Sequence, residues 1–84
     1  MIAAQKVTFY DNVVSITYKY LGPAAERFVA RQIRNHLDKE PELLKRHELP
    51  GLIDWFSLAM ALLSDDEQVI QQFTRDLHEL SGTY

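Results

Sequence analysis

The 84-residue chain has no cysteine, three glycines, three prolines and a single tryptophan. Without cysteine it can form no disulfide, no thiolate zinc site and no cysteine nucleophile. Each glycine falls at an expected element end, so no glycine-rich loop is present to cradle a phosphate. No apolar run reaches the roughly 20 residues that span a bilayer, and the first residues lack the basic start and long apolar stretch of a secretory signal. These absences favour a cytoplasmic protein without membrane contact.

Residues with catalytic or metal-binding chemistry are also sparse. The run Asp65–Glu67 lacks the spaced carboxylates and central glycine of a calcium loop, and helix capping accounts for it. Ser57 and Ser64 stand in no nucleophile motif. No two of the histidines have a spacing that places two ligands on one helix face; they are His36, His47 and His78. We therefore expect no enzyme activity, no metal and no cofactor.

Apolar residues are abundant enough for one folded domain over residues 1–84. They make up 46% of the chain, which argues against disorder. Only Asp54 and Ser57 interrupt the apolar run Leu52–Leu63. A helix without a polar face must be covered on most sides, so this segment is predicted to be the element around which the others pack. The members expected to be packed are Trp55, Phe56, Leu58, Ala59, Leu62 and Leu63.

Residues 7–21 are compatible with two structures. With a period of two, apolar and polar residues alternate from Val14 to Tyr20, and Asp11-Asn12 could turn a β-hairpin. With a helical period, one apolar stripe results, formed by Phe9, Val13, Ile16 and Tyr20. Strand propensity favours the hairpin, whereas a lone hairpin on a helical chain needs an element to cover it. The alternatives are an α+β fold with a hairpin at 7–20 and an all-α fold.

Helices are predicted on both sides of the apolar segment. Gly22-Pro23 breaks the chain and starts a helix to about Leu37, because proline suits the first helical position. Pro41 starts a short helix whose Leu43 and Leu44 face inward. Leu49-Pro50-Gly51 then separates this short helix from the apolar one.

The last predicted helix runs from about Asp65 to Leu80. Ser64 and Glu67 have the spacing of a capping box, and Gly82 is expected to end the helix. The preferred fold class is therefore all-α, a four- or five-helix bundle around the central apolar helix.

One stretch of the sequence resembles a known family. Tyr20-Leu21-Gly22-Pro23-Ala24-Ala25, followed by Phe28-Val29 and Gln32, is similar to a small helical domain of unknown function in bacterial signalling proteins. In that family a helix runs into an aromatic-aliphatic-Gly-Pro-small-Ala break, and further short helices close the bundle. The resemblance implies an all-helical module that works beside kinases and response regulators through protein contact. It also favours the helix over residues 7–21.

Charge is distributed unevenly along the chain. Residues 1–47 carry 8 basic and 5 acidic side chains and residues 48–84 carry 1 and 7, so the halves have charges of +3 and −6. Arg27, Arg31 and Arg34 fall at i, i+4 and i+7, a basic ridge that could meet DNA phosphates. The acidic second half favours a solvated face or a site for an acidic partner instead. A small DNA-binding regulator is thus the alternative function.

Bulky apolar residues are too numerous for all of them to lie inside so small a body; the set considered is Phe9, Tyr10, Tyr18, Tyr20, Trp55, Phe56 and Met60. Those left outside would form an exposed patch, which is typical of contact surfaces, and aromatic residues are common anchors there. We predict a non-catalytic protein-binding or regulatory module, with a homodimer as one form. The predicted partner-binding residues are Tyr10, Tyr18, Tyr20, Arg27, Arg31, Arg34 and Trp55.

Overall fold

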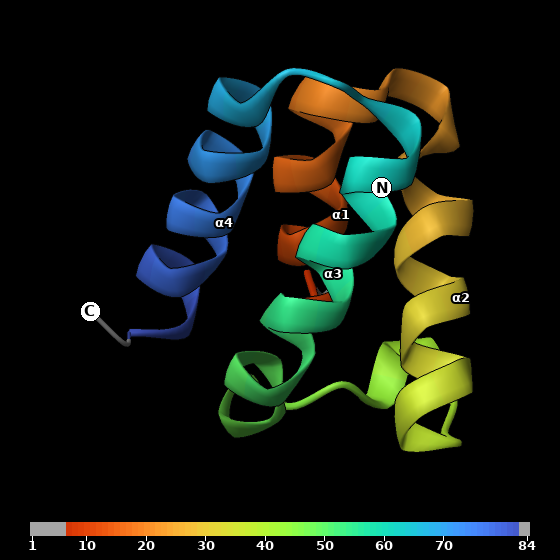
Figure 1. The fold of residues 1–84 in the computed structure, drawn as a ribbon. Helices are drawn as coiled ribbons and strands as arrows, with labels where there is room; N and C mark the ends of the chain where they lie inside the picture. Colours follow the sequence, from red (N-terminus) through yellow and green to blue (C-terminus); the bar gives the residue numbers. More distant parts are fainter. Residues whose placement is uncertain (1–6, 83–84) are drawn as a thin grey trace, which may run out of the picture.

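The computed structural model describes residues 7–82, and all regular secondary structure in this range is helical. Four α-helices are present, α1 (Phe9–Leu21), α2 (Ala25–Leu37), α3 (Leu49–Leu63) and α4 (Glu67–Ser81) (Figure 1). Short 3₁₀ turns cover Gly22–Ala24, Pro41–Leu43 and Arg46–Glu48. The all-α prediction is confirmed, and the alternative with a β-hairpin at 7–20 is wrong.

Helix α1 forms because its first turn is capped and one face is buried. The Thr8 hydroxyl accepts a hydrogen bond from the Asp11 amide at 3.1 Å, and the Asp11 carboxylate accepts one from the Thr8 amide at 3.0 Å. This reciprocal capping box satisfies two backbone donors that a helix start leaves free. Asp11 therefore belongs to a helix start and not to a hairpin turn. Tyr10, Val13 and Thr17 form the buried face.

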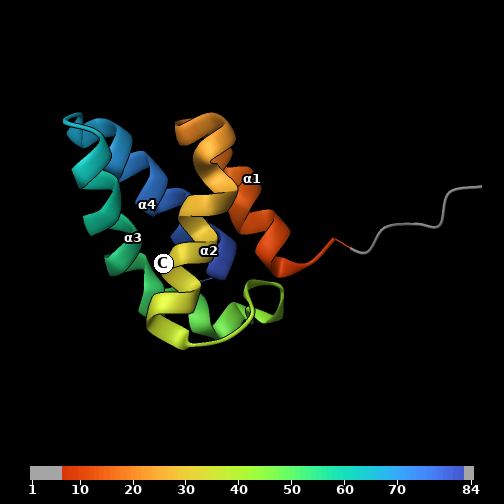
Figure 2. The same ribbon diagram turned by 90° about the vertical axis from the view of Figure 1, so that its right-hand side faces the viewer.

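The helices surround a common core as four neighbours. Helix α1 packs against α2 and α4, and α3 packs against the same two helices from the opposite side. Figure 1 shows α3 in front of α1 with α4 and α2 on either side, and Figure 2 shows the same arrangement from the side of α2. One aromatic ring from each helix takes part in a set of ring contacts in the core; the four rings are Tyr20, Phe28, Phe56 and Phe73. No helix of the described residues is long and apolar enough to cross a membrane.

Helix α3 is therefore a corner of the fold and not its centre. Phe56 is fully buried, but the expectation that apolar residues all round α3 would be covered is wrong. Four short helices around one core leave each helix with an outer side, and the chain has too few elements to wrap α3. The buried side of α3 consists of Leu49, Leu52, Ile53, Phe56 and Met60.

Two predictions about the segment before α3 are also wrong. Leu49-Pro50-Gly51 does not separate elements but forms the first turn of α3, where the missing N–H of Pro50 costs no hydrogen bond. Leu43 points outward with 57% of its surface exposed, whereas Leu44 is buried as expected. The segment is held by an ion pair between Lys39 and Glu48 at 2.9 Å. Hydrogen bonds from Lys39 and from the Lys45 amide lower the pKa of the Glu48 carboxyl.

The start of α4 differs by two residues from the prediction. Asp66, not Ser64, is the N-cap, and its carboxylate accepts a hydrogen bond from the Gln68 amide at 2.9 Å. Ser64 instead ends α3 and accepts a hydrogen bond from the Asp66 amide at 3.2 Å. At the other end Gly82 adopts the left-handed conformation, with φ of 81°, as a glycine stop requires.

Candidate functional site

The outer side of α3 carries an exposed apolar stripe. Trp55, Leu58 and Leu62 follow one another at i, i+3 and i+7, so they lie along one side of the helix. Their exposed fractions are 47%, 61% and 87%, and Leu63 at the end of the helix is 62% exposed. Single exposed leucines are common on protein surfaces, whereas a contiguous apolar stripe marks a contact surface.

This stripe adjoins an open groove between α2 and α3. The groove has a volume of about 360 Å³. Helix α2 contributes Arg27, Phe28, Arg31 and Gln32, Ala24 precedes it, and α3 contributes Ala59, Leu62 and Leu63. Phe28 also stacks on buried Phe56 at a centroid distance of 5.9 Å, which connects the groove to the core. The groove is therefore a mostly apolar hollow with two arginines in its wall, called the α2–α3 groove below.

The seam between the two helices continues from this groove to Trp55. The rings of Trp55 and His36 stack with centroids 4.2 Å apart and an interplanar angle of 15°. The end of α2 meets the middle of α3 here, and the first half of α2 meets the end of α3 at the groove, so the helices run antiparallel. His36 holds one face of the indole, and Trp55 still keeps nearly half of its surface exposed.

The electrostatic character of the α2–α3 groove is set by Arg27 and Arg31. Both side chains are exposed, and the groove lining contains no acidic residue. Within residues 7–82 the ion pairs are Lys19–Asp76 and Lys39–Glu48, so neither guanidinium is in an ion pair there. An exposed cation beside apolar surface attracts an anionic group more strongly than one in bulk water, since the local dielectric constant is lower.

Arg34 is separated from the other two arginines of the predicted ridge. It lines a different hollow, which α2 shares with α1 and the turn Pro41–Leu43, together with Glu26, Glu42 and Tyr10. Arg27 borders both hollows. The three arginines therefore do not form one uniformly basic strip, which weakens the DNA-binding hypothesis.

Tyr10 does not belong to an exposed surface, which corrects its assignment as a partner-binding residue. It is only 4% exposed and is part of the core cluster. Burial raises the pKa of the Tyr10 phenol, and the nearby carboxylates of Glu26 and Glu42 raise it further. A side chain covered in this way is not available as an anchor for another protein.

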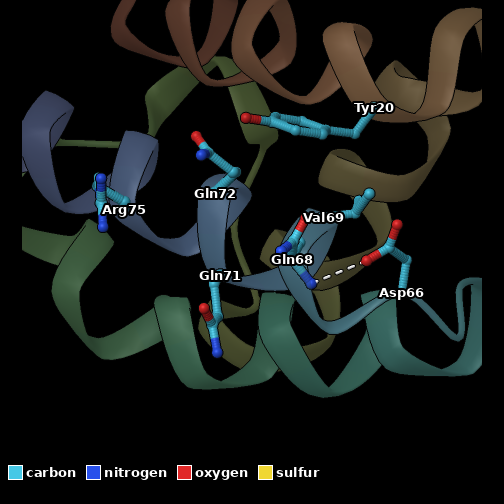
Figure 3. A pocket seen from close by; sticks show the side chains of 7 residues that line it. All are labelled: Tyr20, Asp66, Gln68, Val69, Gln71, Gln72 and Arg75. Atoms are coloured by element: carbon cyan, nitrogen blue, oxygen red, sulfur yellow. Dashed lines mark hydrogen bonds between the residues drawn. The ribbon is translucent and has the colours of Figure 1, made fainter.

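Tyr20 contacts helix α4 of its own chain through both its hydroxyl and its ring. Its hydroxyl donates a hydrogen bond of 2.5 Å to the Asp76 carboxylate, and its ring meets Phe73 at a centroid distance of 5.5 Å. Burial and the hydrogen bond to Asp76 raise the pKa of Tyr20 to about 12. The ring also borders a polar hollow of about 410 Å³ along α4, whose other lining side chains include Gln72 and Arg75 (Figure 3). No convergent set of acid, base and nucleophile lies in this hollow.

Tyr18 lies apart from the α2–α3 groove. It is 57% exposed on α1 and does not line the groove. Of the seven predicted partner-binding residues, the structure brings Arg27, Arg31 and Trp55 to one face of the molecule. The same face contains Leu58, Leu62, Leu63 and His36, which were not among the predicted partner-binding residues. The three leucines belong to the apolar run Leu52–Leu63, whose lack of a polar face predicts a covered helix instead.

Comparisons of the chain with protein-family models, with curated proteins and with solved structures gave no match in any of the three. The resemblance at Tyr20–Gln32 to a bacterial signalling domain therefore stays a prediction. Among residues 7–82 no three histidine or carboxylate side chains gather as a metal site would require.

Proposed function

We propose that the chain is a non-catalytic protein-binding module, in which the four helices act as a bundle. The bundle would present the α2–α3 groove and the adjoining stripe, together called the α2–α3 face below, to a partner. The observation that carries the proposal is the exposed stripe of Trp55, Leu58 and Leu62. Burial of one leucine side chain stabilises a complex by roughly 1.5–3 kcal/mol. A protein contact would therefore gain most of its stability from this stripe.

The stripe is not needed to complete the core. The inner side of α3 is filled by residues that are fully or almost fully buried, including Phe56 and Met60. Trp55, Leu58 and Leu62 point away from that side and remain exposed after folding. Aromatic side chains are enriched among the residues that dominate binding energies, so Trp55 is the expected anchor.

The regulatory role is proposed from the sequence resemblance. The stretch Tyr20–Gln32 is similar to a domain of bacterial signalling proteins, and this similarity supports a cytoplasmic module that works beside such components. The α2–α3 face would then be the surface that those components bind. A homodimer through the same face is the simplest competing form of protein contact.

The test is a photo-crosslinking experiment in the source cell. A photoreactive phenylalanine analogue at Leu62 should give a discrete crosslinked species of higher mass. The same analogue at Gln71, which is exposed on α4, is the matched control. Equal crosslinking from both positions, or none from Leu62, would overturn the proposal.

A further inference from the structure

The α2–α3 groove combines two features that together restrict its occupant. Its apolar lining consists of the half-buried Phe28 and Ala59, with the exposed Leu62 at the rim, and its wall on α2 carries Arg27 and Arg31. These arginines are exposed, form no ion pair within the described residues and have no acid among the groove residues. A ligand that fills the groove therefore meets two guanidiniums at its edge that are in no ion pair among the described residues.

We propose that the groove binds an amphipathic helix from another protein, with an apolar face in the groove and acidic residues along the edge that meets Arg27 and Arg31. This inference rests on the proposed function and names the chemistry of the partner. A helix laid in a groove contributes side chains at i, i+3, i+4 and i+7. Carboxylates on the flank would pair with the guanidiniums and fix the orientation of the helix.

A second copy of the chain fits this groove less well. The other exposed large apolar residues of the described chain, Val7, Tyr18 and Leu43, lie on three separate segments, so they form no stripe. Helix α4 supplies acidic groups, but its outer side is polar, with Gln68, Gln71 and Arg75 exposed. A symmetric contact through α3 would bring two copies of the Arg27 and Arg31 wall to one interface.

A lipid surface is also a poorer occupant. Leucine, tryptophan and arginine together suit a membrane interface, but the apolar lining here lies in a hollow between two helices. A helix can place its side chains against Phe28 and Ala59 inside the hollow, whereas a broad lipid surface would contact mainly the protruding Leu62 and leave those two uncovered. The shape therefore favours the helix.

The experiment uses the whole chain and two synthetic helical peptides of equal length. Both peptides have leucines at i, i+3, i+4 and i+7; one has glutamates along the flank and the other lysines. In fluorescence anisotropy titrations the glutamate peptide should bind about tenfold or more tightly than the lysine peptide, because like charges at an interface oppose binding. Added salt should reduce this difference.

Two variants connect the binding to the groove. Leu62→Asp should abolish binding of both peptides, and the double variant Arg27→Glu, Arg31→Glu should reverse the preference toward the lysine peptide. Arg75→Glu on the outer side of α4 is the control and should leave both affinities unchanged. Since all these positions are exposed, circular dichroism should show that each variant folds like the parent chain.

Several results would overturn the inference. They are equal binding of the two peptides, no binding of either, or a preference that survives the arginine reversal.

Sedimentation that shows a dimer broken by Leu62→Asp would assign the groove to a second copy. Flotation with phosphatidylcholine–phosphatidylglycerol vesicles, or a salt-sensitive shift of duplex DNA lost in Arg31→Glu, would assign the face to lipid or to nucleic acid. If Leu62 crosslinks to a protein but the peptides fail, the proposed function stands and the helical acidic partner is wrong.

Discussion

At the scale of single residues, burial separates side chains that the sequence cannot rank. Tyr10, Tyr18 and Tyr20 lie on one helix within eleven positions, and all three were predicted to bind a partner. The first is buried in the core, the second is exposed, and the third is hydrogen-bonded to α4. The burial of each tyrosine depends on which side of α1 meets α2 and α4. Tertiary packing sets this orientation, and the periodicity of apolar residues does not reveal it.

The hydrogen bond of Tyr20 predicts a stability change at high pH. The pKa of Tyr20 is raised to about 12 in the folded chain, against about 10 in the unfolded chain. The stabilisation is therefore fully present below pH 10 and is lost as pH rises toward 12. Tyr20→Phe should cost about 1.5 kcal/mol at neutral pH through loss of the bond to a carboxylate, and this difference should shrink above pH 10.

Urea denaturation of both proteins between pH 7 and pH 11.5 measures this change. Tyr10, whose pKa is also raised by burial, is present in both proteins, so its titration cancels in the difference. Tyr18→Phe, at an exposed position on the same helix, should not alter the curve. A constant difference between Tyr20→Phe and the parent chain at every pH would contradict the assigned role of the hydroxyl.

At the scale of elements, helix existence was predictable and helix ends were partly so. The Gly22-Pro23 break, the end of α2 at Leu37 and the glycine stop at Gly82 all follow from local backbone chemistry, and the structure has each of them. The spacing Thr8-x-x-Asp11 is a capping signal as well, and recognising it would have favoured a helix at residues 9–21. However, Asp11-Asn12 also suits a turn between strands, so the residues at this position are compatible with both structures.

The start of α4 gives a test at this scale, because two candidate caps lie two residues apart. Asp66→Ala should lower the free energy of unfolding by about 0.5–2 kcal/mol, since it removes the side chain that caps the Gln68 amide. Ser64→Ala should have a smaller effect, because Ser64 bonds only the Asp66 amide ahead of the helix. Thermal and urea denaturation of the two variants would rank them. The reverse order would restore Ser64 as the cap of α4.

At the scale of the whole molecule, the candidate face could not be predicted because it depends on how many elements surround α3. The spacing of Trp55, Leu58 and Leu62 is equally compatible with a covered helix and with an exposed stripe. Only the arrangement of α2 and α4 on two sides of α3, with none of residues 7–82 covering its outer side, decides between them. Likewise, the spacing of Arg27, Arg31 and Arg34 predicts a basic ridge, but the position of the first two beside Leu62 comes from the antiparallel packing of α2 on α3.

The same division between core and outer face predicts very different losses of stability from two large-to-small substitutions. Phe73 is fully buried and its ring meets Tyr20, Phe28 and Phe56, one ring from each of the other helices, at 5.5–6.3 Å. Phe73→Ala should cost about 3–5 kcal/mol, a large part of the roughly 4–13 kcal/mol expected for a chain of this size. Leu62→Ala should change the free energy of unfolding by no more than about 0.5 kcal/mol.

Equilibrium unfolding in urea, followed by circular dichroism, measures both effects in the isolated chain. If Phe73→Ala does not fold, Phe73→Leu provides a milder core change, expected to cost about 1–1.5 kcal/mol with unfolding still cooperative. The decisive comparison is then Phe73→Leu against Leu62→Ala, because the second should be indistinguishable from the parent chain. A loss at Leu62 as large as that at Phe73 would mean that the outer side of α3 is covered in the free protein, and the stripe could not then be a surface reserved for a partner.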